Sequence, residues 1–121
     1  MKIGELARAT GVSVRLLRYY EEQGLLEARR TPGGQRTYAD DAPQVVHRIR
    51  AFLDAGLPTR VIRELLPCVH GDGIDVHPCM SNHLRDQLRS VDERIAGLME
   101  ARASLVAILT TTQQLELLDA A

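Results

Sequence analysis

The fold is decided by residues 13–38, which read S-V-R-L-L-R-Y-Y-E-E-Q-G-L-L-E-A-R-R-T-P-G-G-Q-R-T-Y. Ser13 is suited to cap a helix that runs to about Gln23, and Gly24 is suited to end it. After this glycine the pattern changes to two short extended runs around Pro32-Gly33-Gly34. The stretch therefore predicts one helix followed directly by a hairpin.

The residues before this stretch predict a second short helix. Ile3, Leu6 and Ala7 recur at helical spacing, and Gly11 ends that segment. The link Thr10-Gly11-Val12 has the length and glycine content of the turn in a helix-turn-helix. We therefore expect residues 1–23 to form this motif.

The helix that begins after Ser13 carries a basic stripe. Arg15, Arg18, Tyr19 and Glu22 share one face at helical spacing. Two interpretations of this stripe are open. It is either a solvated face whose arginines pair with glutamates, or the recognition helix of a DNA-binding motif. Periodicity alone does not separate these two interpretations.

The hairpin favours the second interpretation. Residues 25–30 and 35–38 are the two extended candidates, with the turn signal Pro32-Gly33-Gly34 between them. Arg29, Arg30 and Arg36 flank the turn. A basic hairpin directly after a helix-turn-helix is typical of a wing, which lies along the DNA backbone or enters the minor groove.

Two further helices are expected between the hairpin and residue 67. The third begins at Asp40 or Asp41, tolerates Pro43 in its first turn and ends at Gly56. The fourth lies between Pro58 and Pro67. Apolar residues at helical spacing would form their buried faces: Val45, Val46, Ile49, Phe52, Leu53, Val61, Ile62, Leu65 and Leu66.

From residue 81 the apolar pattern becomes a heptad. The apolar positions alternate by four and three, and they are Leu84, Leu88, Val91, Ile95, Leu98, Leu105 and Leu109. Arg102 and Thr112 continue the register as polar exceptions. The pattern predicts a helix over 81–112, about 48 Å long, that pairs with a second copy, and a short tail over 113–121. The alternative is an oversized core helix.

The charges are divided between the two halves of the chain. Residues 1–60 carry ten Lys or Arg and seven acids, whereas residues 61–121 carry five Arg and nine acids. A basic half that contacts phosphate and an acidic half that does not are therefore expected. No run approaches about 18 consecutive apolar residues, so we expect no membrane partner and a cytosolic protein with reduced cysteines.

The sequence resembles the MerR family of bacterial transcription regulators over essentially its whole length. The resemblance rests on I-G-E-L-A-R-A-T-G-V-S-V-R-L-L-R-Y-Y-E-E-Q-G-L-L, on the wing G-G-Q-R-T-Y, and on A-F-L-D-A-G-L-P-T-R-V-I-R-E-L-L. It implies a mainly α fold: a winged helix-turn-helix domain (1–66), a linker (67–80), and a long helix that dimerises as an antiparallel coiled coil.

The resemblance also implies a function and its residues. Such homodimers bind near-palindromic operators in double-stranded promoter DNA and distort the spacer, which affects RNA polymerase indirectly through the promoter, in the cytoplasm at the nucleoid. On this basis the expected DNA contacts are Ser13, Arg15, Arg18, Tyr19, Arg36, Tyr38 and Arg60.

The expected sensor lies in residues 67–80, which contain Cys68-x-His70 and His77-x-Cys79. Three interpretations are open: a reversible disulfide between the cysteines, a site for zinc or another soft metal, or simple packing. Metal-sensing members of the family also use cysteines after the dimer helix. This sequence has no Cys after Cys79 and no His after His83, so it departs from that pattern, and no cofactor is assigned.

Other function classes remain possible on the sequence alone. The chain could be an effector-independent repressor or architectural DNA-binding protein with structural cysteines. An enzyme would need Cys79 and His77 or His83 to meet as nucleophile and base, and no oxyanion or substrate-binding pattern accompanies them. We therefore predict no enzyme. Because the sequence stops shortly after the heptads, a sensor of large drugs is not expected either.

Overall fold

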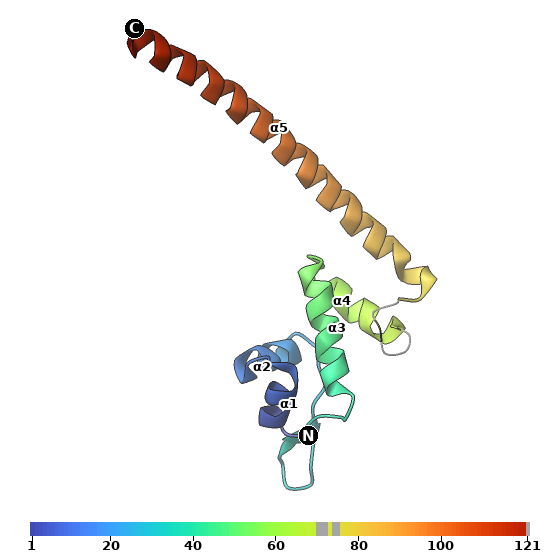
Figure 1. The fold of residues 1–121 in the computed structure, drawn as a ribbon. Helices are drawn as coiled ribbons and strands as arrows, with labels where there is room; N and C mark the ends of the chain where they lie inside the picture. The colour runs from blue at the N-terminus through green and yellow to red at the C-terminus, as the bar shows by residue number, and fades with distance from the viewer. Residues whose placement is uncertain (70–72, 74–75, 121) are drawn as a thin grey trace. The chain divides into compact units, whose positions relative to one another are not determined.

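The computed structural model describes residues 1–69, 73 and 76–120, except for the side chain of Cys79. Figure 1 shows helices with a single small hairpin. The elements are α1 (Ile3–Thr10), α2 (Val14–Glu22), β1 (Arg29–Arg30), β2 (Arg36–Thr37), α3 (Ala42–Asp54), α4 (Thr59–Leu65) and α5 (Ser81–Ala120). The chain divides into two compact units, Met1–His83 and Leu84–Ala121. The expected mainly α fold, a winged helix-turn-helix followed by a long helix, is confirmed.

Local hydrogen bonds produce the turn between α1 and α2. Gly11 adopts a left-handed φ of 70° and its N–H donates to the carbonyl of Ala7, which ends α1. Two residues later the Ser13 side-chain oxygen accepts a hydrogen bond of 3.1 Å from the N–H of Leu16. This capping bond starts α2 where the sequence predicted. The expected helix-turn-helix is therefore formed.

The end of α2 favours glycine because of its left-handed backbone, and Arg63 packs closely over this glycine. Gly24 has a φ of 73°, and the N–H of Leu25 donates to the carbonyl of Tyr20 at 2.9 Å, which closes the helix end. In addition, a Cβ atom at position 24 would lie 3.2 Å from Cδ of Arg63 on α4. The chain thus leaves α2 at a fixed angle, directly beneath the side chain of Arg63.

The wing is a short antiparallel ribbon in which Arg29 pairs with Thr37 and Arg30 with Arg36. Its strands have two residues each, fewer than the extended runs expected from the sequence. Hydrogen bonds around Thr31 close the turn: its N–H donates to the carbonyl of Gln35, and its carbonyl accepts from Gly34. The N-terminal residue lies beside the base of the hairpin (Figure 1).

The helices α1 to α4 enclose one core, to which the hairpin base contributes Tyr38. Its fully buried members come from every helix of the first unit: Leu6, Leu17, Tyr20, Val46, Ile49, Ile62 and Leu65. Asp41 occupies the N-cap position of α3, but its side chain makes no capping bond. Residues 66–68 and 78–80 form 3₁₀ turns at the two ends of the linker 67–80.

The helix α5 runs for 40 residues, from Ser81 to Ala120. The prediction that it ends at Thr112 is wrong, because residues 113–120 continue it. They contain neither glycine nor proline and consist mostly of good helix formers. By length and composition alone α5 could also cross a membrane, since one window reaches a mean hydropathy of 1.2. One such helix is weak evidence, because the core helix of a soluble protein or a signal sequence passes the same test.

Candidate DNA-binding surface

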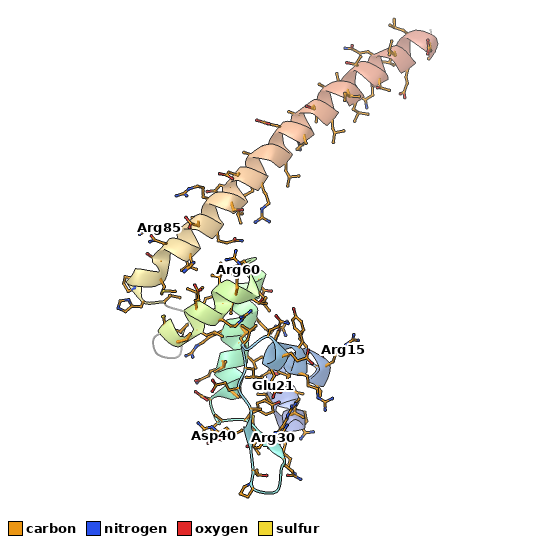
Figure 2. The ribbon with its side chains drawn as sticks, turned by 180° about the vertical axis from the view of Figure 1, so that it is seen from behind. Arg15, Glu21, Arg30, Asp40, Arg60 and Arg85 are labelled. Carbon is orange, nitrogen blue, oxygen red and sulfur yellow. The ribbon has the colours of Figure 1, made fainter. Side chains whose placement is uncertain are left out.

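The outer face of α2 carries the predicted contacts. Ser13, Arg15, Arg18 and Tyr19 are all exposed, and the Tyr19 side chain keeps 44% of its accessible surface. The opposite face is buried, since Leu17 and Tyr20 are 0% and 2% exposed. The helix therefore turns one apolar side to the core and one basic side to solvent, as the sequence predicted. Figure 2 shows Arg15 at the N-terminal end of this helix and Glu21 near its other end.

The basic face of α2 continues onto the wing. A surface hollow of about 330 Å³ is lined by Arg18 from α2, by Arg36 and Tyr38 from the hairpin, and by Lys2 from the N-terminal segment. Arg18 also lines a neighbouring hollow on α2 with Arg15 and Tyr19. The two hollows thus bring five of the predicted contacts, Arg15, Arg18, Tyr19, Arg36 and Tyr38, into one continuous basic surface that spans α2 and the wing.

Glu21 joins the wing to α2, and the sequence analysis did not assign it a role. Its Oε2 accepts a hydrogen bond of 3.2 Å from the hydroxyl of Tyr38 and lies 3.5 Å from Nη1 of Arg36. The Glu21 side chain is only 20% exposed, whereas that of Arg36 is 49% exposed. One carboxylate therefore orients two residues of the hairpin relative to the helix that precedes it.

Tyr38 lies in a different environment from the one expected of a DNA contact. The residue is 3% exposed, and its backbone N–H donates to the carbonyl of Met1 at 2.7 Å. Burial of the hydroxyl raises the pKa of Tyr38, and the Glu21 carboxylate raises it further, against the opposing effect of Arg36 and Arg18. The phenol therefore stays protonated and remains a donor to Glu21 at neutral pH.

Arg60 stands apart from this surface. It is exposed in the first turn of α4, as Figure 2 shows, and it does not line the hollow shared by Arg18 and Arg36. Among residues 1–69, 73 and 76–120 no ion pair fixes the Arg60 guanidinium, and such an exposed arginine suits a phosphate contact better than bidentate recognition of a base.

The two arms of the predicted sensor loop meet at its base. Val69 and Val76 form an antiparallel bridge, and the N–H of His77 donates to the carbonyl of Cys68 at 2.9 Å. Cys68 is a free thiol whose Sγ lies 3.6 Å from the carbonyl of Glu64. His70 and the side chain of Cys79 lie outside the described residues.

The described part of the chain does not by itself build a metal site. No group of three or more His, Cys, Asp or Glu side chains gathers among these residues. Nε2 of His83 lies 3.2 Å from Oε2 of Glu64, so this ring nitrogen already has a close polar neighbour. Cys68 and His77 alone are too few ligands for zinc.

The predicted seam of α5 is exposed along the single chain. Leu88, Ile95, Leu98, Leu105 and Leu109 keep more than half of their accessible surface, and Leu84 keeps 37%. The exposed apolar set is wider than the predicted seam, and its further members are Met99, Val106, Ile108, Leu115, Leu117 and Leu118. The sequence analysis missed them because it followed a single heptad register. Burying so many large apolar side chains requires another surface.

The comparisons with known proteins agree with this geometry. The family described as "MerR HTH family regulatory protein" matches residues 1–67. The nodulation protein NolA of Bradyrhizobium diazoefficiens is 41% identical over 100 residues, which are 74% of this chain and 42% of NolA. The chain thus spans less than half of that relative. The transcriptional regulator ZntR of Escherichia coli is 36% identical over 107 residues, 86% of this chain and 74% of ZntR.

A solved structure extends the likeness beyond the first unit. The transcription regulator PbrR691 of Ralstonia metallidurans, crystallised in complex with lead(II), matches 88% of this chain and 82% of its own, with a TM-score of 0.71 and 26% identity. ZntR and PbrR691 are named as transcription regulators, in line with the prediction of no enzyme. Because the family match covers more than half of the sequence, the chain belongs to the MerR family of helix-turn-helix transcription regulators.

Proposed function

We propose that this protein is a homodimer that binds a near-palindromic promoter operator and distorts the DNA between its half-sites to control transcription. The observation that carries the proposal is the continuous basic surface across α2 and the wing, in which Arg18 and Arg36 line one hollow and Glu21 links the two elements. Two such surfaces on one dimer would contact two half-sites, so operator symmetry would follow protein symmetry.

Within each half-site the two elements have different roles. The exposed face of α2 enters the major groove, where Arg18 and Tyr19 contact base edges and phosphates. Arg36 and the wing contact the adjacent backbone or minor groove. Tyr38 supports Arg36 through their shared partner Glu21 and does not itself reach the DNA. Arg60 on α4 contacts a phosphate at the edge of the site.

Distortion of the DNA between the half-sites follows because one rigid dimer would hold both half-sites at a fixed distance. The seam of α5 pairs with a second copy as an antiparallel coiled coil and sets the distance between the two surfaces. Bending a site of 20–30 base pairs costs on the order of 1–6 kcal/mol, which the contacts at both half-sites must offset. An effector that changes the distance between the two DNA-binding surfaces would shift the population of complexes in which the DNA is distorted.

The proposal is tested by footprinting Arg18→Ala on the promoter that the protein controls. Arg18→Ala should remove the specific footprint while the protein remains a dimer, because Arg18 lines both hollows of the basic surface. Arg50→Ala is the matched control, since Arg50 is exposed on α3 and lines a different hollow. A normal footprint from Arg18→Ala would reject α2 as the recognition helix.

For the signal, we propose a change in thiol state at Cys68 and Cys79. The supporting observation is the pairing of Cys68 with His77, which holds the two arms of the loop together two residues before Cys79. Thiols and metals should be counted on protein purified without oxygen and then exposed to air. Two thiols lost on mild oxidation support the proposal. Stoichiometric metal that Cys68→Ser abolishes would replace it with a metal site, and thiols that stay free would reject both.

A further inference from the structure

A second basic hollow lies at the root of the wing, away from Arg18 and Arg36. Its volume is about 370 Å³, and three arginines from three elements line it: Arg29 on β1, Arg48 on α3 and Arg63 on α4. Leu25 and Leu66 contribute apolar side chains to the same lining. This volume and this mixture of apolar and convergent polar groups are typical of small-molecule sites.

Three arginines and two acids line this hollow, so cationic groups are in excess among its lining side chains. Glu27 and Asp41 also line it, but over residues 1–69, 73 and 76–120 no ion pair joins either acid to Arg29 or Arg63. The excess of cationic side chains in the lining favours an anion over a cation as the occupant, and the guanidinium groups of Arg29 and Arg63 are the groups that it would contact.

Two of the three arginines are already held in place. Nε of Arg48 donates to the carbonyl of Gly73 at 3.0 Å. The stem of Arg63 packs over the backbone of Gly24, with Cδ 3.2 Å from the position that a Cβ atom would take. A ligand therefore meets guanidinium groups whose side chains have already lost part of their conformational entropy, which favours binding.

We propose that this hollow binds a small organic anion, a carboxylate or phosphate ester with an apolar body. The anionic group contacts the guanidinium groups of Arg29 and Arg63, and the apolar body rests against Leu25 and Leu66. Such a ligand connects the wing to α3 and α4, so it would stiffen the wing that contacts DNA. This regulatory consequence rests on the proposed function, whereas the binding itself does not.

Binding should be measured by calorimetry on the full chain without DNA, so that the result does not depend on operator binding. The probes are phenyl phosphate, benzoate, inorganic phosphate and the uncharged benzyl alcohol. We expect the two aromatic anions to bind with heat, inorganic phosphate to bind more weakly, and benzyl alcohol not to bind. Absence of heat with both aromatic anions would overturn the proposal.

Variants assign the binding to this hollow. Arg63→Gln and Arg29→Gln should each weaken phenyl phosphate binding about tenfold or more, the effect of losing one charge-assisted hydrogen bond. Arg29 is exposed on a two-residue strand, so its variant tests the site even if Arg63→Gln fails to fold. Arg50→Gln, which removes the same charge elsewhere on α3, should bind normally. Equal losses in all three variants would indicate non-specific attraction and reject the site.

A last measurement separates a small anion from a DNA phosphate as the occupant. If the hollow takes a small anion, saturating phenyl phosphate leaves non-specific DNA affinity within a factor of two of its starting value at constant ionic strength. If Arg29 and Arg63 instead hold the DNA backbone, the probe competes with DNA and both variants lose DNA affinity. That outcome would overturn the proposal and leave the DNA-binding function intact.

Discussion

At the scale of single residues, Glu21 fixes the position of the wing relative to α2 in the basic surface, because it contacts both Arg36 and Tyr38. An acid beside a DNA-binding face is unfavourable for phosphate contact, yet this one is mostly buried and bound to two wing residues. Its neighbour Glu22 is exposed and lines only the hollow on α2. The two adjacent carboxylates therefore have the same charge and different structural roles, which makes them a natural experimental pair.

Glu21→Gln should lower both stability and sequence discrimination, whereas Glu22→Gln should alter neither by much. Both changes remove one negative charge, so both raise non-specific DNA affinity to a similar extent. Only Glu21→Gln releases Arg36 from its ion pair, and we expect a loss of about 1 kcal/mol in unfolding free energy. Denaturant unfolding and anisotropy with operator and scrambled DNA measure the two effects. Identical behaviour of the two variants would show that the Glu21 contacts have no role.

The exposed basic face of α2 could be predicted from the sequence, because helical periodicity separates Arg15 and Arg18 from Leu17. The inward position of Tyr38 could not be predicted. A strand of two residues has no alternation from which its buried side can be recognised. The partner of Arg36 was equally hidden, since Glu21 lies 15 residues away in sequence. Contacts between an element and the hairpin after it depend on the angle at Gly24, which periodicity does not contain.

At the scale of elements, α5 carries many large apolar side chains that the single chain leaves exposed. At 40 residues it is about 60 Å long, and its large apolar side chains are exposed. The seam stays a prediction, whereas the heptad period predicted the existence of this helix, which is confirmed. Its end was misplaced because the heptads weaken at Thr112, while helix formation depends on backbone propensity and continues to Ala120.

Ile95→Asp combined with Leu98→Asp should convert the proposed dimer to monomer. Burying each of these side chains stabilises by about 1.5–3 kcal/mol, so losing four per dimer raises the dissociation constant by about four powers of ten or more. Sedimentation velocity measures the result. The matched control is Ala96→Asp with Ala103→Asp, which adds the same charge to the same helix outside the seam. A double seam variant that still sediments as a dimer would reject the coiled coil.

At the scale of the whole molecule, the positive charge is concentrated in residues 1–60, within the first unit. Counted over whole units, Met1–His83 carries eleven Lys or Arg and ten acids, and Leu84–Ala121 carries four Arg and six acids. The basic half of the sequence coincides with most of the first unit, and the acidic half includes all of α5. The net charge of −1 therefore conceals an uneven distribution along the chain, in which residues 1–60 are the part that favours DNA. Composition alone would have excluded a nucleic-acid binder, whereas the distribution of charge along the chain predicted one.

Arg60→Ala should weaken DNA binding without changing sequence preference. A dimer that loses two phosphate contacts releases two fewer counterions, so the slope of log affinity against log salt should become shallower by about 2. Anisotropy titrations from low to moderate salt, on operator and scrambled DNA, measure this slope. A change of specificity with an unchanged slope would show that Arg60 reads bases instead of phosphate.

The contact between Gly24 and Arg63 means that residues 13–38 cannot be treated as an independent module. Position 24 ends α2, and position 63 lies on another helix 39 residues later, yet the Arg63 side chain packs where a larger residue at position 24 would extend. A graft that transplants only residues 13–38 into a relative would carry the glycine but not its neighbour. Chimaeras of this family should therefore exchange the helix-turn-helix, the wing and α4 together, and natural recombinants should show the same linkage between the two positions.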